Sequence, residues 1–416
     1  MLALITAGEV VFGLPFVVAR IFRPTFLDVF GLTNFQLGTA FSVYGIVAML
    51  AYFPGGPLAD RFSARRLVTV ALVATSLGGA ILASVPSWRV LALLYAFWGV
   101  TTILLFWAAL IRATREWGGE ATQGRAYGIL DGGRGLVVAI LASITVAIFA
   151  ALLTADVASA TLAQRTDALR KIIWIFTGLT LSVAVLVWIV VPDGNSDRLL
   201  SPRQKLTLEG VRHVLRMPTV WLQAVIVICA YVGYKSTDDF SLFARDAFGY
   251  DDVAAAQIGT ISFWIRPFAA VGAGLLGDRI GLSRATTLSF AIMIVGNLVI
   301  ALGALQPGLY WMLVATVIGT SVGIYAVRGL YFALFQEGHV PLAITGSAVG
   351  LVSVIGYTPD VFMGPLIGHL LDRSPGALGH QHVFAMVATF AGIGLITSLL
   401  FQRVSRLGLI SASEDR

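Results

Sequence analysis

Three ionisable residues, Arg134, Arg266 and Asp360, lie deep inside long apolar stretches of the chain. A helical rise of about 1.5 Å per residue places them roughly 15, 18 and 21 Å from the polar ends of their stretches. Charged groups at such depth in a membrane are costly and normally face a cavity or a partner. Because a guanidinium binds carboxylate or phosphate and a carboxyl can carry a proton, we expect an anion site coupled to proton exchange.

The same argument extends to other cations within apolar stretches and to aromatic residues beside them. Lys235 and Arg20 lie at comparable levels of two different stretches. The predicted substrate-binding residues are Arg134, Arg266, Lys235, Arg20, Arg328, Tyr357 and Trp264.

Permanent ion pairs are the alternative interpretation of these cations. Asp131 lies three residues before Arg134, on the same face of a helix, and Lys235 precedes two acidic residues. Arg266 could pair with Asp360 from another helix. Pairs that never separate would be structural and would bind no substrate.

Proton coupling requires a buried carboxyl group that can take up a proton and a nearby cation that restores its charge. Glu9, Asp131 and Asp360 meet this description. Asp360 is the first choice, because the neighbouring Pro359 can interrupt the helix and expose carbonyl groups to a cavity.

The elements that position these residues are membrane helices. The chain is 57% hydrophobic and 12% charged, with a mean hydropathy of +0.87, which is too apolar for a soluble core. Crossing about 30 Å of hydrocarbon takes about 20 residues. Twelve spans are predicted, at residues 2–22, 37–58, 67–86, 91–111, 126–153, 172–191, 219–244, 255–276, 284–304, 309–335, 345–370 and 383–402.

Basic residues set the expected orientation. They concentrate in the loops after the even-numbered spans and in the tail, as at Arg65, Arg125 and Arg406. The positive-inside rule therefore predicts that this side and both termini are cytoplasmic, in a bacterial inner membrane.

The longest polar stretch divides the chain near its middle. The predicted domains are an N-terminal six-helix bundle at 1–192, a cytoplasmic linker at 193–218, a C-terminal six-helix bundle at 219–403 and a tail at 404–416. Ser201-Pro202 resembles a helix N-cap with proline at the first helical position, which predicts a short amphipathic helix in the linker.

One loop pattern occurs twice. Gly-Gly-Pro-Leu-Ala-Asp-Arg at 55–61 is followed by Gly-Leu-Leu-Gly-Asp-Arg at 274–279, so that Asp60 and Arg61 align with Asp278 and Arg279. The offset is 218 in a chain of 416 residues, since 278 minus 60 is 218. Two homologous halves of this kind are typical of transporters built from repeats.

Twelve spans, a basic linker and Gly-x-Leu-x-Asp-Arg-x-x-x-Arg-Arg at 56–66 resemble the major facilitator superfamily of secondary transporters. The resemblance implies an all-α membrane protein with two pseudo-symmetric six-helix bundles around a central cavity, and alternating access. It also implies that Asp60, Arg61, Asp278 and Arg279 act as a cytoplasmic gate, for which interfacial charge pairs that break on bundle rotation give a physical reason.

Two narrower resemblances concern the cargo. Arg20 and Lys235, on corresponding spans, resemble the paired cations of organophosphate:phosphate antiporters, although Lys235 replaces an Arg. Ile265-Arg266-Pro267 is similar to the anion-binding span of nitrate/nitrite porters. The motifs of proton-coupled drug exporters are absent from the fourth and fifth spans, which disfavours that class.

We therefore expect a secondary transporter of a small organic anion, such as a sugar acid, a carboxylate or a phosphorylated metabolite, with proton-coupled uptake and a monomeric state. A neutral sugar or polyol transporter, a drug-type exporter and a transporter-like ligand sensor are the alternatives. No motif for a nucleotide, a catalytic metal or an acyl-transfer nucleophile occurs, so we expect no enzyme, cofactor, metal site or nucleic-acid partner.

Overall fold

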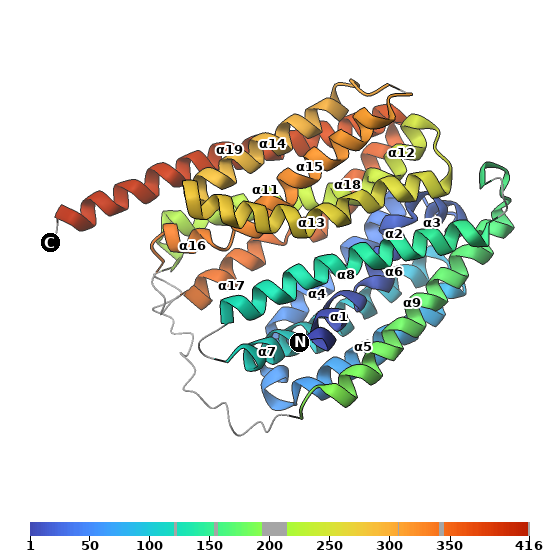
Figure 1. The fold of residues 1–416 in the computed structure, drawn as a ribbon, viewed down its shortest axis with the longest axis horizontal. Helices are drawn as coiled ribbons and strands as arrows, with labels where there is room; N and C mark the ends of the chain where they lie inside the picture. The colour runs from blue at the N-terminus through green and yellow to red at the C-terminus, as the bar shows by residue number, and fades with distance from the viewer. Residues whose placement is uncertain (120–122, 154–156, 194–213, 307, 341–344, 415–416) are drawn as a thin grey trace. The chain divides into compact units, whose positions relative to one another are not determined.

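The computed structural model describes residues 1–119, 123–153, 157–193, 214–306, 308–340 and 345–414. These residues form helices joined by short connections, and they contain no strand (Figure 1). The expected all-α fold is confirmed. The predicted amphipathic helix at Ser201-Pro202 and most of the linker lie outside the described residues.

Helix length and composition confirm the membrane spans. Within the described part of the chain, eleven helices are long and apolar enough to cross a membrane, and a bent pair, Leu2–Val10 with Gly13–Ile21, supplies a twelfth. The pair bends by 40°. The protein is therefore an integral membrane protein.

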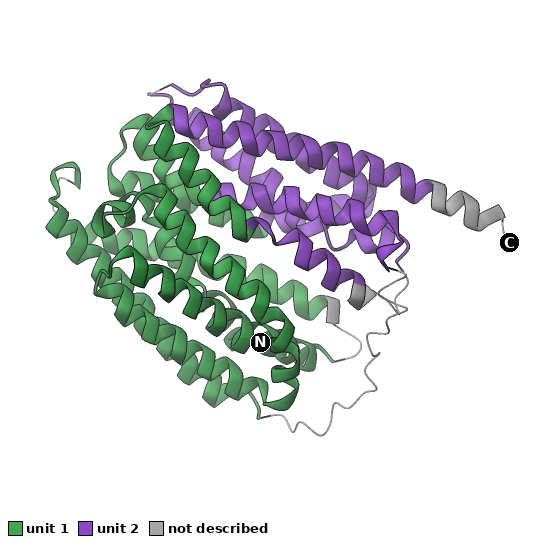
Figure 2. Ribbon diagram, turned by 180° about the vertical axis from the view of Figure 1, so that it is seen from behind, with its two compact units in different colours: residues 1–199, 238–267, 360–377 green, residues 200–237, 268–359, 378–416 purple. Residues whose placement is uncertain are grey.

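The helices group into two compact units (Figure 2). Unit 1 comprises Met1–Leu199, Asp238–Pro267 and Asp360–Ala377, and unit 2 comprises Leu200–Thr237, Phe268–Pro359 and Leu378–Arg416. This grouping follows packing, whereas the predicted domains follow the sequence repeat, so those domain boundaries stay a prediction.

Unit 1 contains the α-helices that the structure describes in the first half of the chain. They are α1 (Leu2–Val10), α2 (Val18–Ile21), α3 (Arg23–Phe30), α4 (Asn34–Arg61), α5 (Ala64–Ala83), α6 (Trp88–Gly99), α7 (Ala108–Gly118), α8 (Gln123–Leu152) and α9 (Leu162–Val190). The α1 helix packs against α8 and α9, and α5 packs against α9. Threonine caps α4 and α9: Thr33 with Gln36 and Thr161 with Gln164 form capping boxes.

The first span is interrupted after Val10, the residue that follows Glu9. The α1 helix ends at Val10, and a π-helical turn at Gly13–Val17 precedes α2. Such turns occur often at functional sites, because they reorient side chains within a helix. The interruption places Glu9 in the last turn of α1, at a bend in the span.

Unit 1 also contains parts of the second half of the chain. These are α12 (Phe240–Phe248), the first part of α13 (Asp252–Ile280) up to Pro267, and almost all of α18 (Pro359–Arg373). The α18 helix crosses α4 where two glycines meet: a Cβ on Gly38 would lie 2.1 Å from the carbonyl oxygen of Gly364. Only glycine permits this backbone approach.

Unit 2 contains the remaining helices of the second half. They are α11 (Pro218–Ser236), the rest of α13, α14 (Leu282–Ala301), α15 (Tyr310–Leu330), α16 (Leu334–Glu337), α17 (Thr345–Gly356) and α19 (Ala377–Glu414). The α11 helix packs against α15 and α17, and α14 packs against α15. The chain leaves the helical conformation at Tyr357 and Thr358, so the helix break predicted beside Pro359 is confirmed.

Candidate functional site

Four of the predicted residues meet within unit 1, and we call them the Glu9 cluster: Glu9, Asp131, Arg134 and Arg266. Glu9 is on α1, Asp131 and Arg134 are on α8, and Arg266 is on α13. The cluster therefore joins the first half of the chain to a helix of the second half.

The Glu9 carboxylate contacts both arginines. Its Oε2 lies 3.3 Å from Arg134 Nε, and its Oε1 lies 3.6 Å from Arg266 Nη1. Asp131 Oδ1 also contacts both, at 3.7 Å from Arg134 Nη1 and 3.2 Å from Arg266 Nη2. Two carboxylates and two guanidiniums thus alternate in a closed ring of charges whose formal sum is zero.

Burial differs between the two carboxylates. The Glu9 side chain is 7% exposed, and its α1 neighbours Ile5 and Val10 belong to an apolar cluster. Its Oε2 is buried and accepts no hydrogen bond from any described residue. The Asp131 side chain is 64% exposed. Glu9 is therefore the carboxylate whose charge depends most on the two guanidiniums.

Backbone and aromatic contacts fix Arg134. Its Nε donates to the carbonyl of Gly8 at 3.0 Å, and a Cβ on Gly8 would lie 3.0 Å from the Cδ of Arg134. The guanidinium also lies over the rings of Trp107 and Phe12, at 5.5 and 5.8 Å from their centroids. Glycine at position 8 therefore leaves room for the arginine beside Glu9.

Other predicted residues of unit 1 lie in different surroundings. Arg20 forms a close buried ion pair with Asp238 and lies over the Phe263 ring at 5.4 Å. Trp264 donates from Nε1 to Ser143 Oγ at 2.9 Å. Asp360 lies at the start of α18, with its backbone against Gly45 of α4.

In unit 2, Arg328 and Tyr357 lie beside other tyrosines. These tyrosines were not recognised as a group from the sequence. Arg328 lies over the rings of Tyr234 and Tyr231, at 3.7 and 5.7 Å from their centroids. Tyr357 packs against Tyr231 with ring centroids 5.0 Å apart. The signal was present in the sequence as tyrosines three residues apart on the seventh span. Lys235 is buried at the end of α11.

The predicted gate residues lie at helix ends. Asp60 and Arg61 end α4, and Asp278 and Arg279 lie in the last turn of α13. Near the first pair, Arg112 Nη1 donates to the carbonyl of Ala59 at 2.6 Å. Their role as a gate stays a prediction.

The two copies of the loop are held by different residues. In the first copy Asp193 Oδ2 lies 2.7 Å from Arg65 and 3.2 Å from Arg66. A hydrogen bond with Ser63 and the charges of these two arginines hold the pKa of Asp193 below its ordinary value, against the effect of partial burial. In the second copy Glu337 accepts from the backbone N–H of Ser283 at 3.0 Å, at the start of α14.

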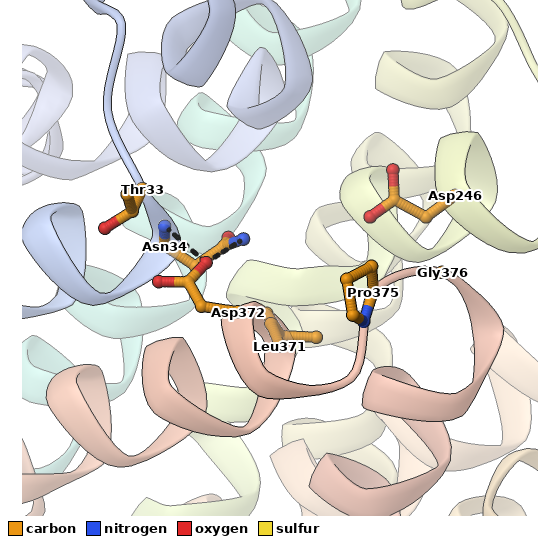
Figure 3. A pocket seen from close by; sticks show the side chains of 7 residues that line it. All are labelled: Thr33, Asn34, Asp246, Leu371, Asp372, Pro375 and Gly376. Carbon is orange, nitrogen blue, oxygen red and sulfur yellow. Dashed lines mark hydrogen bonds between the residues drawn. The ribbon is translucent and has the colours of Figure 1, made fainter.

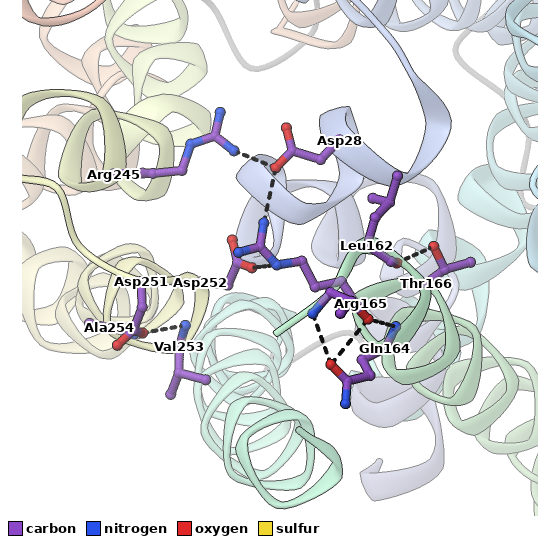
Figure 4. A network of polar contacts seen from close by, with 11 residues as sticks. Asp28, Leu162, Gln164, Arg165, Thr166, Arg245, Asp251, Asp252, Val253 and Ala254 are labelled. Carbon is purple, nitrogen blue, oxygen red and sulfur yellow. Dashed lines mark hydrogen bonds and ion pairs between the residues drawn. The ribbon is translucent and has the colours of Figure 1, made fainter. Parts of the chain in front are cut away.

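A second charge network of unit 1, the Asp28 network, consists of Asp28, Arg165, Arg245 and Asp252 (Figure 4). Asp28 Oδ2 lies 2.9 Å from Arg245 Nη1 and 3.5 Å from Arg165 Nη1, and Arg165 Nε lies 3.0 Å from Asp252. The network joins α3 and α9 to α12 and α13, at the side opposite the one that the sequence predicts to be cytoplasmic.

An open hollow of about 470 Å³ lies nearby, lined by Thr33, Asn34, Asp246, Leu371, Asp372, Pro375 and Gly376 (Figure 3). Asp372 is already satisfied there: it accepts from the backbone N–H groups of Asn34 and Phe35 at 3.0 and 2.8 Å. These bonds stabilise the start of α4 and tie α18 to it. The hollow offers no unsatisfied charge for a ligand.

Known proteins resemble this chain over nearly its whole length. Residues 5–358 match the model of the Major Facilitator Superfamily. Inner membrane protein YqcE of Escherichia coli (strain K12) is 31% identical, over 90% of this chain and 88% of that protein. Inner membrane protein YihN of the same organism is 26% identical, over 96% of this chain and 94% of that protein.

Two solved structures share the fold. A bacterial homologue of the human lysosomal transporter Spinster, in an inward-facing and unoccupied conformation, has a TM-score of 0.75 and 17% identity, covering 97% of this chain and 96% of that one. The nucleoside transporter NupG has a TM-score of 0.71 and 14% identity, covering 97% and 98%. At these identities the likeness concerns the fold alone.

Proposed function

Because the chain belongs to the major facilitator superfamily, we propose that this membrane transporter takes up a small organic anion together with a proton. The observation that carries the proposal is the buried Glu9 carboxylate, which contacts Arg134 and Arg266 at 3.3 and 3.6 Å. The cluster combines a group that can carry a proton with two groups that can bind an anion.

Charge balance couples the two ligands. With Glu9 ionised, the two arginines and the two carboxylates sum to zero, and the carboxylates occupy the guanidinium donors. Protonation of Glu9 leaves two positive charges against the single negative charge of Asp131, a sum of +1. An anion then restores neutrality and replaces the lost contacts of the guanidiniums, so the proton and the anion favour each other's binding.

The reverse sequence releases the cargo. When Glu9 loses its proton, its carboxylate competes with the anion for Arg134 and Arg266. The exposed Asp131 offers a route for the proton between water and Glu9. Glu9 is thus favoured over Asp360 as the coupling carboxyl, while Asp360 and Asp131 remain candidates for accessory proton transfer.

The proposal also includes the oligomeric state of the protein, its membrane and its orientation. The protein acts as a monomer in a bacterial inner membrane with both termini in the cytoplasm, as the basic loops suggest. Asp60, Arg61, Asp278 and Arg279 act as the cytoplasmic gate, and the Asp28 network closes the opposite side. Lys235, Arg20 and Trp264 contribute to the walls of the substrate path.

Flux through purified protein tests the function. The protein is reconstituted in liposomes with an acidic exterior, and uptake of sugar acids, dicarboxylates and sugar phosphates is compared with uptake of their uncharged analogues. We expect accumulation of at least one anion, which stops when a protonophore collapses the pH gradient.

Three outcomes would contradict the proposal. Accumulation of only the uncharged analogues would indicate a neutral sugar or polyol transporter. Binding without flux would indicate a ligand sensor. Anion uptake that is unaffected by the pH gradient would exclude proton coupling.

A further inference from the structure

Arg328 carries a charge that no described carboxylate balances. It lies on α15, and no carboxylate oxygen of a described residue lies within 4.0 Å of its guanidinium. Its Nη1 is buried and makes no hydrogen bond to any residue that the structure describes. This distinguishes it from Arg134 and Arg266, which share two carboxylates.

Tyrosines surround the guanidinium. Tyr231 and Tyr234 lie three residues apart on one face of α11, and Tyr325 lies three residues before Arg328 on one face of α15. Tyr234 is 6.3 Å from Tyr325 and 5.5 Å from Tyr231, between ring centroids, and Tyr357 completes the group beside Tyr231. We call these four residues the tyrosine cluster.

The cluster is partly open. Tyr325 is buried, with 2% exposure, whereas Tyr231, Tyr234, Tyr357 and Arg328 are each partly exposed. A ligand can therefore reach the rings of Tyr231, Tyr234 and Tyr357 and the partly exposed Arg328, while the buried Tyr325 packs against Tyr234.

The rings compensate the charge of Arg328 only in part. A cation over an aromatic face gains less free energy than an unpaired charge inside a membrane protein costs. A bound anion would balance the charge of the guanidinium. A purely structural arginine at this position would be expected to have a carboxylate partner.

We propose that Arg328 and the tyrosine cluster bind a hydroxylated organic anion, with Arg328 on the carboxylate or phosphate and the tyrosines on the hydroxylated body. Phenol hydroxyls both donate and accept hydrogen bonds, and ring faces pack against the C–H groups of a sugar or a polyol. This inference rests on the proposed function, since it names the class of anion that the transporter carries.

Binding to the purified full-length protein tests the inference. Gluconate and glucose 6-phosphate carry both an anion and hydroxyl groups, hexanoate carries only the anion, and sorbitol carries only hydroxyl groups. We expect the wild type to bind gluconate or glucose 6-phosphate at least tenfold more tightly than hexanoate or sorbitol, a difference of about 1.4 kcal/mol.

Variants assign the binding to these residues. Arg328→Gln should weaken binding of the preferred anion at least tenfold, and Arg328→Lys should weaken it less. Tyr231→Phe should weaken binding of the hydroxylated anion but leave hexanoate unchanged. The matched controls are Arg170→Gln, whose arginine donates to the Ala83 carbonyl, and Tyr310→Phe, whose tyrosine is exposed; both should bind like the wild type. Size-exclusion profiles and melting temperatures verify folding.

The outcomes separate this inference from the proposed function. Proton-driven uptake that prefers hexanoate, or a folded Arg328→Gln variant with wild-type affinity, would overturn the inference and leave the proposed function in place. A failure of the wild type to bind either hydroxylated anion would also overturn it. An absence of any proton-driven anion uptake would instead contradict the proposed function.

Discussion

Glu9 and Asp28 each contact two arginines, but the two carboxylates differ in how far they are exposed. Each carboxylate contacts one arginine from the first half of the chain and one from the second: Arg134 and Arg266 for Glu9, and Arg165 and Arg245 for Asp28. The Glu9 side chain is 7% exposed and that of Asp28 is 36% exposed. Water can therefore compensate Asp28 but hardly reaches Glu9.

This difference in exposure supports the two proposed roles, which are proton coupling for Glu9 and closure of one side of the transporter for the Asp28 network. Removing the negative charge of Glu9 leaves Arg134 and Arg266, whose side chains are 12% and 14% exposed, with Asp131 as their shared carboxylate, and an anion can supply the second negative charge. Removing that of Asp28 leaves two partly exposed cations that water solvates, and Arg165 retains Asp252 at 3.0 Å. Exposed ion pairs contribute up to about 1 kcal/mol, whereas breaking a buried one costs about 3–5 kcal/mol.

The largest effect is expected from removing the shared arginine of the Glu9 cluster. Arg266→Gln should raise the Kd for the transported anion roughly 30-fold or more, because losing one partner of a buried charge pair costs at least about 2 kcal/mol. Arg245→Gln, the equivalent change in the Asp28 network, should change the Kd less than about fivefold. Equilibrium binding in detergent measures both, and equal losses would remove the distinction.

The next effect concerns pH. If one proton accompanies each anion, the affinity of the wild type should fall about tenfold per pH unit over the range in which Glu9 is ionised in the free protein. Glu9→Gln, which mimics the protonated form, should bind with little pH dependence and exchange anion for anion, but should not accumulate it. Asp28→Asn is the matched control.

Gradient-driven uptake and counterflow in liposomes distinguish these variants. Asp28→Asn should keep the pH dependence and the accumulation of the wild type. Accumulation by Glu9→Gln at the wild-type level would assign the coupling to another carboxyl, with Asp360 the next to test.

The smallest effect is expected at Asp193, which also contacts two arginines, both at the start of α5. Its lowered pKa means that any stabilisation is present above the ordinary value of 3.8 and is lost as the pH falls through the lower value in the folded protein. Asp193→Asn should therefore lower the melting temperature slightly at pH 7 and less at pH 3. A larger loss at pH 3 than at pH 7 would contradict this assignment.

Several features of the site could be predicted from the sequence. The depth of Arg134 and Arg266 in apolar stretches identified them as candidates, and the spacing of Asp131 and Arg134 predicted their contact, which the structure shows at 3.7 Å. The predicted contact is confirmed because helical periodicity places residues three apart on one face of a helix, whereas the substrate-binding role of Arg134 and Arg266 stays a prediction.

The partners could not be predicted in the same way. Asp360 was preferred over Glu9 for the proton, yet it is Glu9 that lies between the two arginines. Arg20 was expected to bind substrate, and it pairs with Asp238, which lies 218 residues away in the sequence. The tyrosines around Arg328 were not recognised as a group, because they come from three separate segments.

The sequence by itself determined the class of the protein and the depth of its charges. Hydropathy and helical rise depend only on residues near one another in the chain, and the duplicated Asp-Arg loop is recognised by comparing two short segments. Tertiary structure decided which charges meet and which of them water reaches. Those properties depend on how helices rotate and cross, as at the bend after Glu9 and the contact of Gly38 with Gly364. The chemistry proposed for Glu9 and for Arg328 follows from the tertiary structure.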